Sequence, residues 1–193
     1  MTESTNATGG SARNKWLLFI IVGILAFAAD QATKVWARQS LPTAPAGCVV
    51  PDDIVARKCA GVPVPVIDGF WEWDLSMNTG VAFSMFAGKR WPLAVVGLLA
   101  VMGMIYMLHK ARNDQKILHW ALALVIGGAV GNLFERIYFG AVTDFVLWRY
   151  KQHRWPVFNV ADVVLVVGVG LMMIDIIIEG RREKARKAQQ SAA

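Results

Sequence analysis

The sequence predicts an all-α polytopic membrane protein with four transmembrane helices, a small β-rich unit in the first outside loop and an interfacial segment between helices three and four. Of the 193 residues, 55% are hydrophobic and only 18% are charged, whereas an ordinary soluble domain carries about 25% charged residues. The apolar residues gather in four long runs, and basic residues cluster beside those runs. These observations favour lipid over water as the solvent of the chain.

The four apolar runs predict membrane spans at residues 16–36, 91–108, 117–139 and 157–178. A bilayer core about 30 Å thick requires about 20 helical residues. The second and fourth runs reach this length alone, and the first and third reach it if the polar sequels "DQATKVW" and "GNLFERIYF" continue the helices. We therefore expect a single four-helix domain at residues 15–178.

Basic clusters orient the chain in the membrane. They precede the first span, separate the second from the third in "HKARNDQK", and follow the fourth in "GRREKARKAQQ". Because positive residues near span ends mark the cytoplasmic side, we expect a disordered cytoplasmic tail at residues 1–14 and a basic cytoplasmic tail at 179–193. The net charge of +6 comes without a DNA-binding pattern, which argues against a nucleic-acid partner.

The first apolar run has a second interpretation. Arg13 and Lys15, the apolar stretch after them and "AFA" at residues 26–28 are also typical of a cleavable secretion signal. The mass of the mature N-terminus would decide between a span and a signal.

Two segments are expected outside the membrane. In the first, "VPVIDGFWEWDLSMNTGVAFSMF" alternates apolar and polar residues, which predicts a small strand or hairpin unit. The second, "GAVTDFVLWRYKQHRWP", interleaves aromatic and basic residues and is typical of an interfacial helix or loop. Cys48 and Cys59 both fall in the first loop, where a disulfide and two free thiols are both open.

Helix rise converts sequence position into depth and brings three polar residues to one level. At 1.5 Å per residue, Asp30 lies about 21 Å and Asn132 about 22 Å above the inner ends of their spans. The fourth span descends, so Asp162 lies about 8 Å below the outer boundary, which is the same level in a core of about 30 Å. Asp175 lies near the cytoplasmic boundary and is assigned no function.

Neighbouring polar residues share helix faces with these three. Lys34 follows Asp30 by four residues, Arg136 follows Asn132 by four, and Asn159 precedes Asp162 by three, so each pair lies on one face. Simple structural roles remain open for some of them: Asp30 with Lys34 as a charge pair, and Arg136 as a headgroup anchor. For Asp162 a purely structural role is a weak explanation, because ionisable residues at membrane depth usually line a functional cavity.

Asp144 and Asp162 form the candidate catalytic pair. Asp144 lies just outside the third span and Asp162 just inside the fourth, so the segment between them can fold both to one level. Two close carboxylates share a proton, and such a pair supplies the acid and the base that peptide hydrolysis requires. From spacing alone it is equally a proton or cation relay of a small transporter. The three histidines are scattered and predict no metal site.

Five motifs decide between these alternatives. "DQATK" (30–34), "MNTGVAF" (77–83), "GGAVGNLFER" (127–136), "VTDFV" (142–146) and "FNVAD" (158–162) follow one another in the order and approximate spacing of the lipoprotein signal peptidases, also called signal peptidase II or prolipoprotein signal peptidase. The chain resembles this family from Asp30 to Asp162.

The resemblance implies an intramembrane aspartic endopeptidase that removes the signal peptide from diacylglyceryl-modified prolipoproteins, on the N-terminal side of the lipidated lipobox Cys. It implies Asp144 and Asp162 as the catalytic residues, with no cofactor and no metal. It also implies substrate-binding or supporting roles for seven residues: Asp30, Lys34, Asn78, Gly80, Asn132, Arg136 and Asn159. The chain departs from the family at Glu135, where Asp is more usual, and in the loop of Cys48 and Cys59, which is longer.

The resemblance further implies a location and partners. We expect a multi-pass protein of the bacterial cytoplasmic (inner) membrane, with its active site towards the periplasmic side, its β-rich loop unit in the periplasm, membrane lipids around it and a monomeric state.

A transporter would need polar residues through the full membrane depth, but the inner two-thirds of each span is nearly free of them. A non-catalytic scaffold would explain neither Asp162 nor the shared depth.

Overall fold

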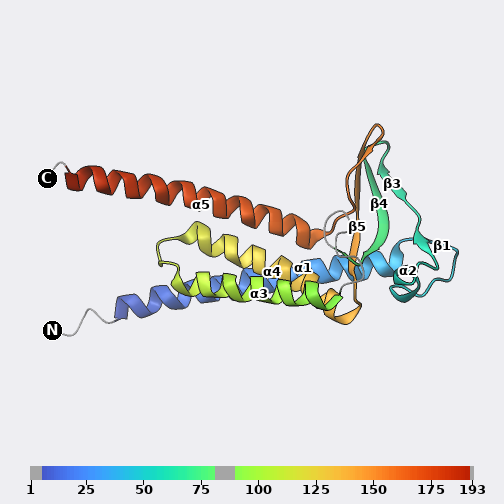
Figure 1. Cartoon of the computed structure of the whole chain (residues 1–193), viewed down its shortest axis with the longest axis horizontal. Coiled ribbons are helices and arrows are strands. Elements are labelled where there is room, and N and C mark those ends of the chain that lie inside the picture. The colour runs from blue at the N-terminus through green and yellow to red at the C-terminus, as the bar shows by residue number, and fades with distance from the viewer. Residues whose placement is uncertain (1–5, 81–89, 192–193) are drawn as a thin grey trace.

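The computed structural model describes residues 6–80 and 90–191, with side chains from residue 14 onward in those ranges. It contains four helices long and apolar enough to cross a membrane: α1 (Asn6–Ser40), α3 (Arg90–Lys110), α4 (Lys116–Tyr138) and α5 (Val160–Ser191). The helices run along the long axis, with both termini at one end and the strands at the other (Figure 1). The predicted four-helix membrane fold is confirmed.

The boundaries of α1 and α5 differ from the predicted ones. Helix α1 begins at Asn6, so residues 6–14, expected as a disordered tail, continue the helix, because adding residues to an existing helix is easier than nucleating one. Residues 1–5 of that tail lie outside the described residues. Helix α5 begins at Val160 rather than 157, because Phe158 pairs with Val146 in an antiparallel bridge. It continues to Ser191, so the basic tail is helical over residues 179–191.

Helix α4 is the centre of the helix assembly. It contacts α1, α3 and α5, and 61% of its membrane-length window is buried, against 17% in each of the other three. Glycines permit this packing: a Cβ on Gly127 would lie 2.7 Å from the Cβ of Ala26 in α1. A Cβ on Gly128 would lie 2.6 Å from the carbonyl oxygen of Ala161 in α5. The "GGAVG" stretch is therefore a close-packing patch.

The β-rich unit is a four-stranded antiparallel sheet in the order β3 (Val64–Ile67), β4 (Trp71–Asn78), β5 (Val142–Tyr150) and β6 (His153–Arg154). The segment between the third and fourth spans supplies β5 and β6, so the expectation of a helix or loop there was wrong. Its "VTDFVLW" stretch is rich in β-branched and aromatic residues, which suit a strand, and it pairs with β4 along its length. Ser76 lies opposite Asp144 and Asn78 opposite Val142, so β4 brings Asn78 close to the first candidate carboxylate.

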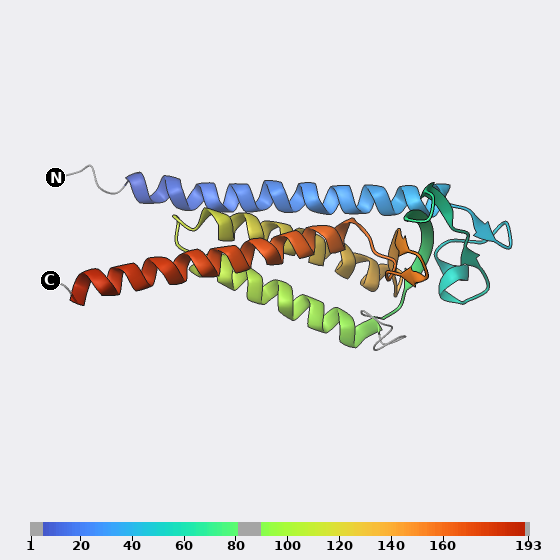
Figure 2. The same cartoon turned by 90° about the horizontal axis from the view of Figure 1, so that it is seen from above.

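The remainder of the first outside loop lies against this sheet and contains β1 (Thr43–Ala44), α2 (Asp52–Val55) and β2 (Ala60–Gly61). Cys48 and Cys59 are joined by a disulfide, which is one of the two alternatives the sequence left open. Ile54 packs against a buried apolar cluster that joins α1 to the sheet, formed by Ala37, Leu75 and Phe145. Figure 2 shows this loop at the end of the molecule farthest from the termini.

Candidate active site

Asp144 lies near the start of β5 and is almost fully buried, with 3% of its surface exposed. Both of its carboxyl oxygens accept hydrogen bonds from side-chain amides. The Nδ2 of Asn159 donates to Oδ1 at 2.6 Å, and the Nδ2 of Asn78 donates to Oδ2 at 3.1 Å. The carboxyl group is thus held from two sides, by β4 and by the residue that precedes α5.

Asp162 lies in the first turn of α5 and is half-buried. It forms a capping box with Asn159: the backbone N–H of Asn159 donates to Asp162 Oδ2 at 3.1 Å, and the backbone N–H of Asp162 donates to Asn159 Oδ1 at 3.0 Å. The Nδ2 of Asn132 in α4 donates to the other oxygen, Oδ1, at 3.0 Å. The start of the helix therefore orients this carboxylate.

Asn159 connects the two aspartates, because its side-chain amide donates to Asp144 while its backbone N–H donates to Asp162. Both aspartates line one cavity of about 710 Å³, which lies between α3, α4, the start of α5 and the sheet. We call it the active-site cavity. Asn78, Asn132 and Arg136 line it as well. The two carboxylates therefore face a common space large enough for a peptide segment.

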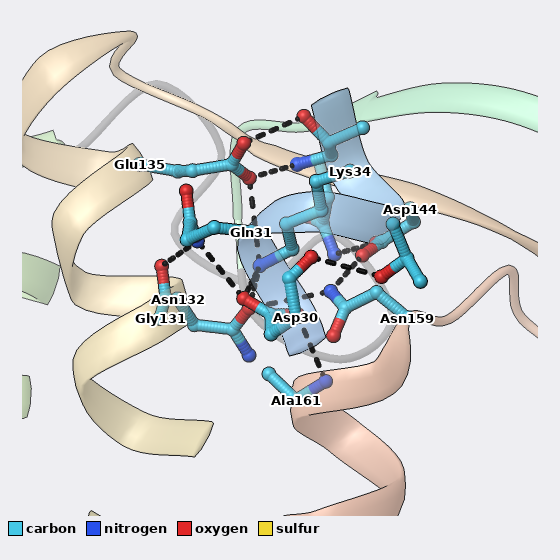
Figure 3. Close-up of polar contacts among 12 residues, drawn as sticks. Asp30, Gln31, Lys34, Gly131, Asn132, Glu135, Asp144, Asn159 and Ala161 are labelled. Carbon is cyan, nitrogen blue, oxygen red and sulfur yellow. Dashed lines mark hydrogen bonds and ion pairs between the residues drawn. The ribbon is translucent and has the colours of Figure 1, made fainter. Parts of the chain in front are cut away.

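Four charged side chains, Asp30, Lys34, Arg38 and Glu135, form a buried ionic cluster between α1 and α4. Figure 3 shows Asp30, Lys34 and Glu135 of this cluster. The Nζ of Lys34 lies 2.8 Å from Asp30 Oδ2 and 3.5 Å from Glu135 Oε2, and all three side chains are fully buried. Arg38 pairs with Glu135 from the next turn of α1. Two cations balance two anions, as buried charges require.

The ionic cluster contacts α5 and α4 through hydrogen bonds. Asp30 Oδ1 accepts the backbone N–H of Ala161 at 3.0 Å, so a residue of α1 satisfies a free donor in the first turn of α5. Lys34 Nζ donates to Asn132 Oδ1 at 2.8 Å, which leaves the Nδ2 of Asn132 directed at Asp162. The pair of Asp30 and Lys34 therefore does more than balance charge at a helix end.

Glu135 contacts the residue next to Asp144. Its Oε2 accepts the backbone N–H of Thr143 at 2.7 Å, and its Oε1 accepts the hydroxyl of Thr143 at 2.9 Å. Arg38 Nη1 donates to the same hydroxyl oxygen at 2.8 Å. The Glu side chain thus reaches β5, and its extra methylene relative to Asp is accommodated.

Sequence reasoning missed Arg38 and Thr143 as parts of the site. Arg38 lies two residues beyond the predicted end of the first span at residue 36 and therefore fell in the predicted outside loop. The signal was present: Asp30, Lys34 and Arg38 recur every four residues and so share a face if the helix continues.

Arg136 and Gly80 complete the set of predicted residues. Arg136 Nη2 donates to the carbonyl oxygen of Gly80 at 3.3 Å, and the Gly80 N–H donates to Asn78 Oδ1 at 3.0 Å. Arg136 thereby supports the end of β4 beside the active-site cavity. All predicted site residues lie in this connected region, while residues 81–83 of the "MNTGVAF" motif lie outside the described residues. Their catalytic and binding roles stay predictions.

Burial, together with the nearby negative charge of Asp162, raises the pKa of Asp144 to about 7. The amides of Asn78 and Asn159 and the charge of Lys34 oppose this rise in pKa. A carboxyl group with such a pKa can hold a proton at neutral pH and release it during a reaction.

Over residues 6–80 and 90–191, no three His, Cys, Asp or Glu side chains gather as they would around a metal ion.

The fold and the site define a multi-pass membrane protein with paired carboxylates at one end of its helices. Comparison with known proteins gives the family: residues 21–178 match the family model of signal peptidase (SPase) II. The chain belongs to the signal peptidase II family and is a peptidase.

Individual relatives agree with this assignment. The chain is 35% identical to a lipoprotein signal peptidase of Symbiobacterium thermophilum, over 88% of this chain and 100% of the relative. It is 35% identical to a lipoprotein signal peptidase of Xanthomonas euvesicatoria, over 90% of this chain and 91% of that one. A solved structure of a bacterial membrane enzyme has the same fold, with a TM-score of 0.69 at 23% identity, over 84% of this chain and 88% of that one.

The ionic cluster predicts a large effect of Lys34→Met on stability. The substitution leaves Asp30 and Glu135 buried without their shared cation, which is expected to lower the free energy of unfolding by about 3–5 kcal/mol. Thermal unfolding in detergent would measure the loss. Lys58→Met is the matched control, because Lys58 is 72% exposed in its pair with Asp53 and should leave the unfolding temperature unchanged. Equal unfolding temperatures for the two variants would contradict the role of the cluster.

Proposed function

We propose that this chain is an intramembrane aspartic endopeptidase that removes the signal peptide from diacylglyceryl-modified prolipoproteins, on the N-terminal side of the lipidated Cys. One observation carries the proposal: Asp144 and Asp162 line the same cavity and are connected through Asn159. Membership of the signal peptidase II family and the names of the relatives support the choice of substrate.

The environments of the two aspartates support a division of labour. Asp162 lies at the N-terminus of α5, where the helix dipole favours a negative charge, and it is the more exposed of the two. In our proposal it acts as the base: it takes a proton from a water molecule, whose oxygen attacks the scissile carbonyl carbon. Asp144, with its pKa raised to about 7, acts as the acid and gives its proton to the carbonyl oxygen.

The second half of the reaction reverses the proton positions. The C–N bond of the tetrahedral intermediate breaks as its nitrogen takes the proton held on Asp162. One hydroxyl group of the intermediate returns its proton to Asp144 as the carbonyl re-forms. The products are the carboxyl terminus of the signal peptide and the free α-amino group of the lipidated Cys. Asn159 and Asn132 do not react, and they hold the two carboxyl groups at fixed positions.

The fold also supports an orientation. Both termini lie at the end opposite the sheet (Figure 1), and the basic residues 181–187 belong to that end. In our proposal this end faces the cytoplasm, and the active-site cavity opens towards the periplasmic side of a bacterial inner membrane. A scissile bond beside a lipid anchor and above a signal helix would lie at this level.

The alternative of a proton or cation transporter is not favoured. The polar site residues lie at one end of α4 and α5, and the residues that α4 buries between Ala121 and Gly128 are apolar. A transport path would need polar groups along that stretch.

Asp144→Asn and Asp162→Asn are each expected to lower the cleavage rate by at least about 10³-fold, since acid and base act as a unit. The gel shift of a lipidated prolipoprotein on loss of its signal peptide measures the rate. Asp175→Asn is the control, because Asp175 is a buried aspartate in the middle of the same helix, about 20 Å along the helix from Asp162, and should leave the rate within about twofold. Near-normal cleavage by either dyad variant would exclude the proposed mechanism.

The raised pKa of Asp144 predicts a falling rate at alkaline pH. Because Asp144 must carry a proton to act as the acid, kcat/KM should decrease as pH rises through about 7, by about tenfold per pH unit. Asn78→Leu removes a hydrogen bond that lowers this pKa, so the falling limb should move to higher pH. A rate that rises through pH 7, or a limb that Asn78→Leu leaves in place, would contradict the assignment of Asp144 as the acid.

A further inference from the structure

A second cavity, of about 850 Å³, lies between the first outside loop and β4 and has no part in the function proposed above. We call it the outer cavity. Its loop wall includes Ile54, Arg57, Ala60 and Pro63, and its sheet wall includes Asp74 and Ser76. The loop wall belongs to the first outside loop, whose stretch around Cys48 and Cys59 the resemblance predicts to be longer than the signal peptidase pattern requires.

The outer cavity adjoins the active-site cavity. Ser76, Asn78 and Val157 line both of them, and Asn78 donates a hydrogen bond to Asp144. The outer cavity therefore begins at a residue that contacts one of the two aspartates.

The sheet wall of the outer cavity is about as long as a short peptide in an extended conformation. Asp74, Ser76 and Asn78 all line the outer cavity and are half-buried, while Leu75 and Met77 between them are buried. Four residues of strand separate Asp74 from Asn78, which is about 13 Å. At the far end of this row, Arg154 Nη2 donates to Asp74 Oδ2 at 3.1 Å.

One edge of β4 is available in this region. β3 pairs with β4 only as far as Trp73, and the loop backbone at Gly61 lies against Leu75. Beyond Leu75, among the residues that the structure describes, no other strand pairs with that edge. Such an edge binds an extended peptide through its backbone N–H and C=O groups. A row of polar side chains beside it suits a polar segment better than an apolar one.

The loop wall is held in place from both sides. The disulfide between Cys48 and Cys59 closes the loop, and Ile54 packs on the apolar cluster of Ala37, Leu75 and Phe145. At Gly61 the loop backbone comes so close to β4 that a Cβ would lie 2.8 Å from the backbone nitrogen of Leu75. The outer cavity therefore has a fixed shape and can select what it binds.

We propose that the outer cavity binds, in an extended conformation, the first four or so residues that follow the lipidated Cys of the substrate. This inference rests on the proposed function. The signal peptide leaves the aspartates towards the membrane, so the mature segment must leave towards the outer end of the molecule. The outside loop that lines this cavity lies at that end (Figure 2). The signal peptide and the lipid are required for cleavage, and the loop adds a selection among substrates by the residues that follow the Cys.

Two lipidated substrates with the same signal peptide test the inference. One ends at the residue after the Cys, and the other continues into a full polar mature segment. Ala60→Trp fills the outer cavity from its loop wall, and Val62→Trp is the matched control, because Val62 lies in the same loop, is 38% exposed and does not line the cavity. We expect Ala60→Trp to raise KM about tenfold for the long substrate, with kcat unchanged, since a binding contact is lost.

Cleavage of the short substrate should be the same for wild type, Ala60→Trp and Val62→Trp. An equal effect of Ala60→Trp on both substrates, or on neither, would overturn the inference while leaving the proposed function intact. If the wild type cleaves neither substrate, or if Asp144→Asn cleaves both, the proposed function fails and the inference fails with it.

Photocrosslinking gives a readout that does not depend on how Ala60→Trp folds. A p-benzoyl-phenylalanine at the third residue after the Cys, bound to the inactive Asp162→Asn variant, should crosslink to the loop peptide that contains Ala60. Crosslinks confined to the helices would contradict the inference.

Discussion

The buried ionic cluster between α1 and α4 is the interaction on which the rest of the site depends. Lys34 and Glu135 are fully buried, where unpaired ions would each cost several kcal/mol, so the positions of these helices are tightly coupled. Hydrogen bonds of the cluster also reach three residues outside it. The N–H groups of Thr143 and Ala161 donate to Glu135 and Asp30, and Lys34 donates to Asn132. Each of these residues adjoins or contacts a candidate catalytic aspartate, so one cluster positions both.

The same arrangement gives the two aspartates different surroundings. Asp144 is enclosed at the start of a strand, with 3% exposure and two amide donors. Asp162 lies in the first turn of a helix, half-exposed to the active-site cavity. Enclosure favours the neutral form of a carboxyl group, and a helix N-terminus favours the charged form. An acid and a base therefore arise from one residue type, because a strand and a helix end meet there.

The sequence predicted the helices and the shared depth of Asp30, Asn132 and Asp162, because apolar runs and helix rise determine those features directly, whereas Asn78 and Gly80 were predicted only through the family resemblance. It did not predict that residues 142–150 form a strand, since interleaved aromatic and basic residues suit an interfacial helix as well as a strand, and only pairing with β4 decides. It did not predict the part played by Arg38, because hydropathy ends the first span before the helix ends. The outer cavity depends on loop packing at Ile54 and Gly61, which no local pattern encodes.

Infrared difference spectroscopy of the carboxyl C=O stretch tests the central claim most directly, because it reports which aspartate holds the proton. Spectra of wild type, Asp144→Asn and Asp162→Asn would be compared across neutral pH. The account predicts a protonated carboxyl band in the wild type that titrates near pH 7, in line with the pKa of Asp144 raised to about 7. The band should be absent in Asp144→Asn and present in Asp162→Asn, titrating at a lower pH because the charge of Asp162 is gone. A band that persists in Asp144→Asn, or no protonated carboxyl near neutral pH in the wild type, would contradict it.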